Sequence, residues 1–126
     1  MTPKTEPIVL ARRTFDGSLG ANLVTHGVGA LNLEACRDVK GRLPTNIFRC
    51  TKPDKKERGD YTHPTLKPIE LLRRLVRLVV RPGALILDPF AGTGTVGAAA
   101  RAEACRYILI EREPRFVAEA RRRLSI

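Results

Sequence analysis

The chain has 126 residues, of which 43% are hydrophobic and 29% are charged. This length and composition predict one globular domain or part of one, and they exclude a disordered chain. The net charge of +10 favours a polyanionic partner such as nucleic acid, although a protein that is merely basic has the same balance.

Membrane and disulfide classes are also excluded by the composition. No apolar run reaches the roughly 18 residues that a membrane helix needs, and the N-terminus lacks the apolar stretch of a signal peptide. The three cysteines (Cys36, Cys50 and Cys105) are widely spaced and form no Cys-x-x-Cys pair. We therefore expect a cytoplasmic protein with reduced thiols, without a metal site and without a membrane partner.

The first half of the chain gives weak signals. Residues 6–13 hold the run Ile-Val-Leu-Ala after Pro7, which predicts a buried strand. Short helices are expected near 20–26 and over 30–36. Residues 39–60 are polar and predict an exposed, mobile loop. Four of its basic side chains crowd around Pro53 and Gly59 and are here called the basic cluster. They either contact DNA phosphates or are simply solvated: Lys52, Lys55, Lys56 and Arg58.

The second half alternates helices and strands. Residues 68–80 predict a helix that begins at Pro68 and is followed by Arg81-Pro82-Gly83. Its apolar face consists of Ile69, Leu72, Leu75, Val76, Val79 and Val80. Buried strands are expected over 84–87 and 107–110, and helices over 95–104 and from Pro114 onward, the last one burying Phe116, Val117, Ala120 and Leu124. This order is typical of a doubly wound α/β fold.

Residues 88–95, here called the glycine loop, join the first of these strands to a helix. Glycines at such a junction let the backbone approach a ligand, and an acidic residue there is typical of adenosine cofactor sites. Gly92, Gly94 and Gly97 satisfy Gly-x-Gly-x-x-Gly, and Glu111 follows Gly92 by 19 residues, which also fits a dinucleotide site.

The position of Asp88 favours a different ligand. Its carboxylate would repel a pyrophosphate but attract the ammonium and sulfonium groups of S-adenosylmethionine. A P-loop is excluded, because Gly97 is followed by Ala98 and not by lysine.

Three strings together resemble the N6-adenine/N4-cytosine DNA methyltransferases. Residues 88–95 (Asp-Pro-Phe-Ala-Gly-Thr-Gly-Thr) are similar to motif I, residues 108–111 (Ile-Leu-Ile-Glu) to motif II, and residues 63–68 (His-Pro-Thr-Leu-Lys-Pro) to motif X. Two weaker matches, at 29–33 and 41–46, look like phage-type DNA methylases. The resemblance covers residues 61–124 and implies a Rossmann-like S-adenosylmethionine-dependent fold with a partial doubly wound sheet.

The resemblance also implies a role for each matching residue. The cofactor-binding residues would be His63, Thr65, Lys67, Asp88, Phe90, Ala91, Gly92, Thr93, Gly94, Thr95 and Glu111. Glu111 would bind the ribose, and the glycine loop would face the methionine end of S-adenosyl-L-methionine. Structural alternatives remain open: Asp88 as a cap of its turn, Glu111 as an exposed strand end, His63 as a loop histidine bonded to backbone, and Lys67 as a solvated lysine.

The family's catalytic loop, Asp/Asn/Ser-Pro-Pro-aromatic, has no counterpart, because the chain contains no Pro-Pro pair. We therefore assign no catalytic residue. We expect residues 1–126 to be one incomplete methyltransferase domain, with a strand and an irregular DNA-facing region over 1–60 and a cofactor-binding core over 61–126. The chain is then a fragment, a subunit completed by another chain, or a remnant.

The resemblance implies an enzyme that methylates an exocyclic amine of double-stranded DNA, with adenine N6 favoured over cytosine N4. Its partners would be DNA and a second chain or an N-terminal half that carries the catalytic loop. Two alternatives remain: a non-catalytic module that binds S-adenosylmethionine or nucleic acid, and a fragment of a dinucleotide-dependent oxidoreductase.

Overall fold

The structure is a computed structural model that describes residues 5–126. The chain forms two compact units, Met1–Ala30 and Leu31–Ile126. The first contains α1 (Leu19–His26), which begins where the Ser18 hydroxyl accepts a hydrogen bond from the Ala21 amide. It ends at Gly27, which adopts the left-handed conformation that glycine favours. The expected helix over 20–26 is confirmed.

The expected strand over residues 6–13 does not form. These residues have no regular secondary structure and are exposed, and Val9 is 87% exposed. A strand is stable only when a neighbouring strand pairs with its backbone, and the two strands found in residues 5–126 pair with each other. The prediction of a buried strand from this apolar run was therefore wrong, because no strand among the described residues pairs with it.

The second unit begins with irregular chain that carries two short helical turns. The expected helix over 30–36 is present only as the turn η1 (Glu34–Cys36). The expected loop over 39–60 contains the helix α2 (Lys55–Arg58), because Asp54 accepts a hydrogen bond from the Glu57 amide at 2.7 Å and caps the turn. Three members of the basic cluster are therefore held on a helical turn.

Helix α3 (Ile69–Val79) follows Pro68, as expected. Pro68 offers no capping side chain, and the Glu57 carboxylate accepts the Ile69 amide at 2.6 Å instead. The expected apolar face is wrong at its end: Leu78 is buried, whereas Val79 is 44% exposed. The physical reason is that η1 packs on α3, and the Asn32 amide binds the carbonyl of Leu78.

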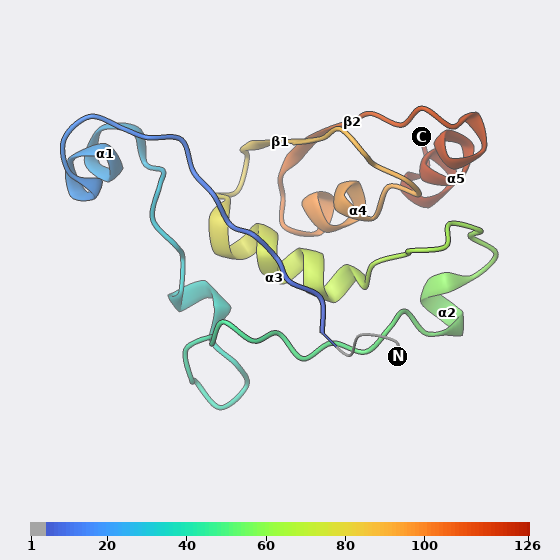
Figure 1. Cartoon of the computed structure of the whole chain (residues 1–126), viewed down its shortest axis with the longest axis horizontal. Coiled ribbons are helices and arrows are strands. Elements are labelled where there is room, and N and C mark those ends of the chain that lie inside the picture. Colours follow the sequence, from blue (N-terminus) through green and yellow to red (C-terminus); the bar gives the residue numbers. More distant parts are fainter. Residues whose placement is uncertain (1–4) are drawn as a thin grey trace. The chain divides into compact units, whose positions relative to one another are not determined.

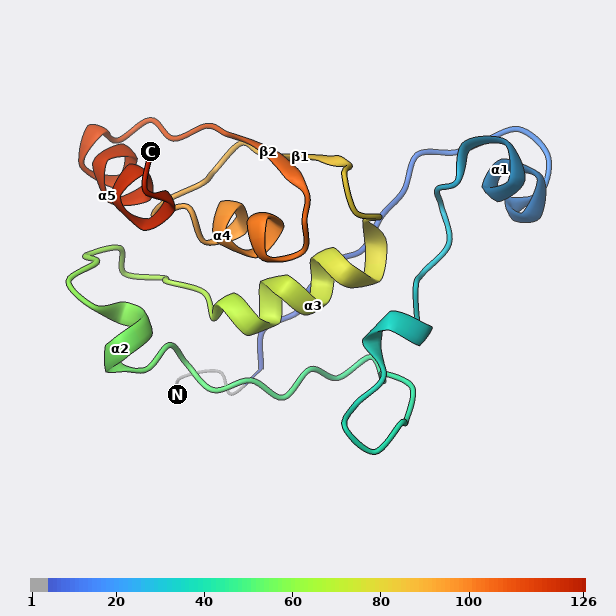
Figure 2. The same ribbon diagram turned by 180° about the vertical axis from the view of Figure 1, so that it is seen from behind.

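The sheet consists of two parallel strands, β1 (Leu85–Asp88) and β2 (Arg106–Leu109), with Leu85 opposite Arg106. Helix α4 (Thr95–Ala102) connects them, and α5 (Pro114–Leu124) packs on α4. Figures 1 and 2 show α3 and α4 on the same side of the strands. The core lies between these layers: Val76, Ala99, Ala100 and Cys105, with Ile86 and Tyr107 packed against it.

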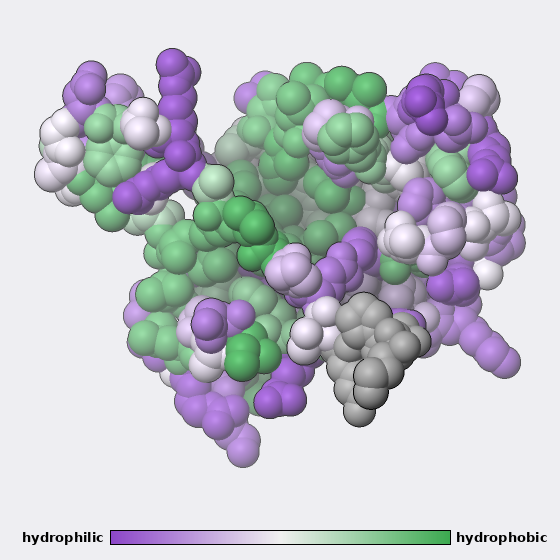
Figure 3. All heavy atoms as spheres, viewed as in Figure 1, coloured by the Kyte–Doolittle hydropathy of each residue, from purple (hydrophilic) through white to green (hydrophobic). Residues whose placement is uncertain are grey.

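The opposite side of the sheet is uncovered. Alternate residues of the two strands, and Ile110 just after β2, are exposed there. These four large aliphatic side chains, here called the open sheet face, are 49% to 60% exposed: Leu85, Leu87, Ile108 and Ile110. In Figure 3, hydrophobic residues gather along the top of the molecule, where Figure 1 places β1 and β2. Both strands were expected to be buried, and that expectation holds for one face only, because helices cover a single side.

None of the helices in residues 5–126 is long and apolar enough to cross a membrane. The three cysteines are free thiols, and Cys105 is buried.

Candidate functional site

The glycine loop lies between the carboxyl end of β1 and the first residue of α4. Asp88 ends β1, and its Oδ1 accepts the Phe90 amide at 3.0 Å, so the side chain caps its own turn. Gly92 and Gly94 adopt φ values of +51° and +74°. Side chains with a Cβ rarely adopt such values, so the loop depends on glycine at both positions.

Glu111 approaches the glycine loop from the neighbouring strand. It follows β2, and its Oε2 accepts the Gly92 amide at 2.8 Å while its Oε1 accepts the Glu113 amide at 2.8 Å. The Glu113 hydrogen bond holds the pKa of Glu111 below its usual range, against the opposing effect of desolvation, and the Gly92 amide lowers the pKa further. The carboxylate is therefore ionised near neutral pH and is fixed against the loop.

His63 approaches Gly92 from the other direction. A Cβ on Gly92 would lie 3.3 Å from both Cδ2 and Nε2 of the imidazole ring. The ring also lies 4.5 Å from the ring of Phe116, measured between centroids. Its Nδ1 accepts the Thr65 amide at 3.2 Å, as a loop histidine bonded to backbone would. The structure thus brings together the three strings, centred on Glu111, the glycine loop and His63, at Gly92.

The other residues of the expected cofactor set differ in exposure. Phe90 is 87% exposed beside Asp88. Thr65 is exposed, and Lys67 is half-buried. The side chains of Ala91, Thr93 and Thr95 are buried inside the loop. Their roles in cofactor binding remain predictions.

Two glycines of the Gly-x-Gly-x-x-Gly string are required by packing. A Cβ on Gly97 would lie 2.7 Å from Cδ1 of Leu109, and one on Gly94 would lie 3.0 Å from Cβ of Ala120. These glycines therefore let α4 approach β2 and α5 closely. The sequence pattern indicates close backbone approach but does not say whether the neighbour is a ligand or a helix.

The contribution of α5 was missed by sequence reasoning. Phe116 was expected only in the core, yet its ring contacts His63. Glu119 was not assigned a role, yet it is only 9% exposed and accepts hydrogen bonds from Thr62. A glutamate three residues after a core phenylalanine on the same helix is the one signal that could have indicated this, because positions i and i+3 share a face.

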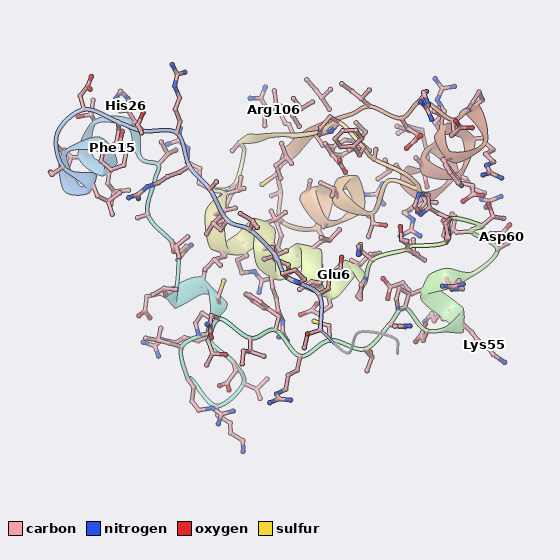
Figure 4. All side chains as sticks on the ribbon, viewed as in Figure 1. Glu6, Phe15, His26, Lys55, Asp60 and Arg106 are labelled. Carbon is pink, nitrogen blue, oxygen red and sulfur yellow. The ribbon has the colours of Figure 1, made fainter. Side chains whose placement is uncertain are left out.

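The basic cluster is exposed throughout. Figure 4 shows Lys55 pointing away from the body of the protein. The contact of the basic cluster with DNA phosphates stays a prediction.

Two hollows in the described chain, of about 400 and 250 Å³, lie outside the glycine loop. The larger is within the first unit, and the smaller is lined by Arg49, Cys50, Thr51, Glu57, Pro68, Glu70 and Arg74. Neither contains the residues that meet at Gly92, where the Glu111 carboxylate and the His63 imidazole ring both approach the glycine loop.

Comparison with known proteins decides the family. A model of the DNA methylase family, covering N6 and N4 methyltransferases, matches residues 2–122. The chain belongs to this DNA methylase family. It is 44% identical over 81 residues to the type II methyltransferase M.HinfI of Haemophilus influenzae, a match that covers 63% of this chain and 23% of that protein.

A solved structure supports the fold. The PvuII DNA methyltransferase, described as cytosine-N4-specific, matches with a TM-score of 0.61 and 24% identity over 72% of this chain and 34% of that chain. The M1.HpyAVI–SAM complex matches with a TM-score of 0.49 and 33% identity over 51% of this chain and 32% of that one. The chain thus has part of the Rossmann-like fold of the methyltransferases and spans about a quarter of the length of the curated relative that it matches.

Proposed function

We propose that this chain is the cofactor-binding portion of a DNA amino-methyltransferase and that it binds S-adenosyl-L-methionine at the glycine loop. The observation that carries the proposal is the convergence at Gly92, whose amide is bonded to Glu111 and whose α-carbon faces the ring of His63. The same three strings supported the family resemblance, and family membership is shown over nearly the whole chain.

The residues at the site suit a cationic adenosine ligand. Asp88 and Glu111 place two carboxylates at the carboxyl ends of adjacent parallel strands, where α/β proteins bind their ligands. The lowered pKa keeps Glu111 ionised, so it can accept hydrogen bonds from ribose hydroxyls. Phe90 offers an exposed aromatic ring next to the loop. We infer that Asp88 attracts the charged methionine end.

When bound, S-adenosyl-L-methionine would supply an electrophilic methyl group. The exocyclic amine of a base would form the new N–C bond as the C–S bond breaks, the sulfur would leave as a neutral thioether, and the amine would lose a proton to solvent. The residues of this chain bind and orient the donor, because alignment of the reacting atoms supplies much of the rate. The base must leave the duplex stack to reach the site. We propose that the residues contacting that base belong to the remainder of the domain.

We propose adenine N6 as the target, in preference to cytosine N4, because adenine methylation is the commoner activity in this family. Double-stranded DNA is the proposed substrate, held partly by the exposed basic cluster. Nucleoside analysis of methylated DNA distinguishes N6-methyladenine from N4-methylcytosine directly.

We also propose that the part carrying the catalytic loop packs on the open sheet face. Parallel sheets are covered on both faces, and four aliphatic residues exposed on one face favour a helical layer there. The relatives are long enough to supply it, because the matched segment is 23% of M.HinfI and 34% of PvuII methyltransferase. A Leu87→Lys variant should bind the cofactor normally but fail to associate with that part.

The test of cofactor binding is a calorimetric titration with S-adenosyl-L-methionine. Asp88→Asn keeps an oxygen that can cap the Phe90 amide but removes the charge, so binding should weaken by about tenfold. Asp38→Asn is the matched control, because Asp38 is paired with Arg42 away from the loop and its loss should leave affinity unchanged. Saturable binding of a nicotinamide cofactor in place of S-adenosyl-L-methionine would contradict the proposal.

The test of enzymatic function supplies the rest of the domain in trans and measures methyl transfer to DNA. A folded complex that binds both DNA and S-adenosyl-L-methionine but transfers no methyl group would support a non-catalytic binding module instead.

A further inference from the structure

Four consecutive residues, 60–63, lead into the motif X string and each contact α5. Residues 60–65 are here called the His63 loop. Thr62 donates twice to Glu119, from its amide at 3.1 Å and from its hydroxyl at 2.7 Å. The other three contacts are Asp60 with Arg122, Tyr61 with Arg122 and Arg123, and His63 with Phe116.

The contacted residues of α5 form one stripe along the helix. Glu119 follows Phe116 by three residues and is followed by Arg122 and Arg123 after three and four, so these side chains lie along one side of the helix. Figure 4 shows Asp60 beside the helix that Figure 1 labels α5. Residues 60–63 of the loop therefore lie along α5, each in contact with at least one side chain of that helix.

The contact between Thr62 and Glu119 is the centre of this stripe. Glu119 is 9% exposed, and a buried carboxylate must be satisfied by hydrogen-bond donors. Two of its donors come from the single residue Thr62. Hydrogen bonds to a charged acceptor are stronger than neutral ones, so this pair fixes the backbone of the loop next to His63.

The consequence reaches the cofactor site through the next residue. His63 is held between Phe116, at 4.5 Å, and Gly92, where a Cβ would meet the ring at 3.3 Å. Gly92 in turn donates its amide to Glu111. Contacts thus run without a gap from Glu119 through Thr62, His63 and Gly92 to Glu111.

We propose that Glu119 is a positioning residue for the S-adenosyl-L-methionine site, acting through Thr62 to hold His63 against Gly92. This proposal rests on the proposed function of the site. Glu119 touches neither the glycine loop nor Glu111 in any hydrogen bond of the described structure, so its effect on the cofactor is transmitted by the His63 loop.

The experiment measures two properties of the full chain in Thr62→Val and Glu119→Gln variants. The first is the nuclear magnetic resonance signal of the His63 ring protons, which Phe116 shifts at 4.5 Å. The second is affinity for S-adenosyl-L-methionine. We expect the His63 signals to move toward those of an exposed histidine and affinity to fall by about fivefold or more in both variants.

Two variants serve as controls. Thr62→Ser keeps both donors and should restore the wild-type His63 signals and affinity. Glu34→Gln makes the same chemical change at an exposed carboxylate on η1 that pairs with Arg37, and it should leave the His63 signals unchanged. A loss of affinity in Thr62→Ser equal to that in Thr62→Val would overturn the proposal, because the hydroxyl would then be irrelevant.

The two readouts separate this proposal from the proposed function. His63 signals that respond as expected in a chain without affinity for S-adenosyl-L-methionine would support the structural linkage and contradict the function of the site. His63 signals that stay fixed in Thr62→Val overturn the positioning role, even when the wild-type chain binds the cofactor. Thr62→Val keeps the carboxylate and the core, so it provides this answer if Glu119→Gln does not fold.

Discussion

Gly94→Ala should destabilise the chain even in the absence of any ligand. Gly94 has φ of +74°, and an added Cβ would lie 3.0 Å from Cβ and 3.3 Å from Cα of Ala120 on α5. The left-handed conformation costs a residue with a Cβ about 1 to 2 kcal/mol. Overpacking a tight contact costs about 1 to 3 kcal/mol. Because Ala120 contributes its backbone to the contact, the neighbour cannot rotate away.

The matched control is Gly83→Ala. Gly83 has φ of +80°, but nothing lies within 4 Å of the Cβ that would be added. This variant therefore carries the backbone strain without the steric contact, and it should lose only about 1 to 2 kcal/mol. The difference between the two variants isolates the contact between α4 and α5.

The assay is urea denaturation of the purified chain, followed by far-ultraviolet circular dichroism. A double variant that adds Ala120→Gly removes the atom nearest to the new Cβ, and it should recover about 1 kcal/mol of coupling energy. Equal losses in Gly94→Ala and Gly83→Ala would refute the reasoning, because Gly94 would then serve only its backbone conformation. If Gly94→Ala weakens cofactor binding but leaves the free energy of unfolding unchanged, Gly94 serves the ligand site and not the packing of α5.

Three further predictions concern charge. Glu103 accepts hydrogen bonds from Arg77 and Arg73, and the Arg77 bond is the main reason that the pKa of Glu103 is lowered. The stability that Glu103 contributes is therefore fully present above the ordinary carboxyl pKa and is lost as the pH falls through the lowered pKa. Glu103→Gln should lower the free energy of unfolding by about 1 to 2 kcal/mol at neutral pH and make it less dependent on pH in acid. The control Glu70→Gln, at an exposed carboxylate, should change the free energy of unfolding little, and denaturation at several pH values measures both variants. The lowered pKa of Glu111 predicts cofactor affinity that is constant through neutral pH and falls only under acid conditions, and a calorimetric pH series in which affinity declines near neutrality would contradict this role. Replacing all four residues of the basic cluster by alanine should reduce the slope of log affinity against log salt for duplex DNA by about 3 to 4, and an unchanged slope would exclude the cluster from the interface.

The sequence by itself determined the order and type of the elements in the second unit. The apolar period and the prolines predicted α3 and α5 within a residue or two, and the short apolar runs predicted β1 and β2. These signals are local, because helix capping, the absence of proline from helix interiors and the period of the apolar side chains all act within a few residues. The sequence also determined the family, because the strings around His63, Gly92 and Glu111 occur in one order.

Tertiary structure decided which of these residues meet. Residues 6–13 had the composition of a strand but found no partner in the described chain, because strand pairing is non-local. Gly94 and Gly97 satisfied a ligand-binding pattern but are required by the close packing of α4 against α5 and β2. The contact between Thr62 and Glu119 joins residues 57 positions apart, which no local pattern encodes. The site at Gly92 therefore consists of three strings that are separate in the sequence. Contacts with α5 and between the parallel strands bring them together, because burial and hydrogen bonding act between residues that are distant along the chain.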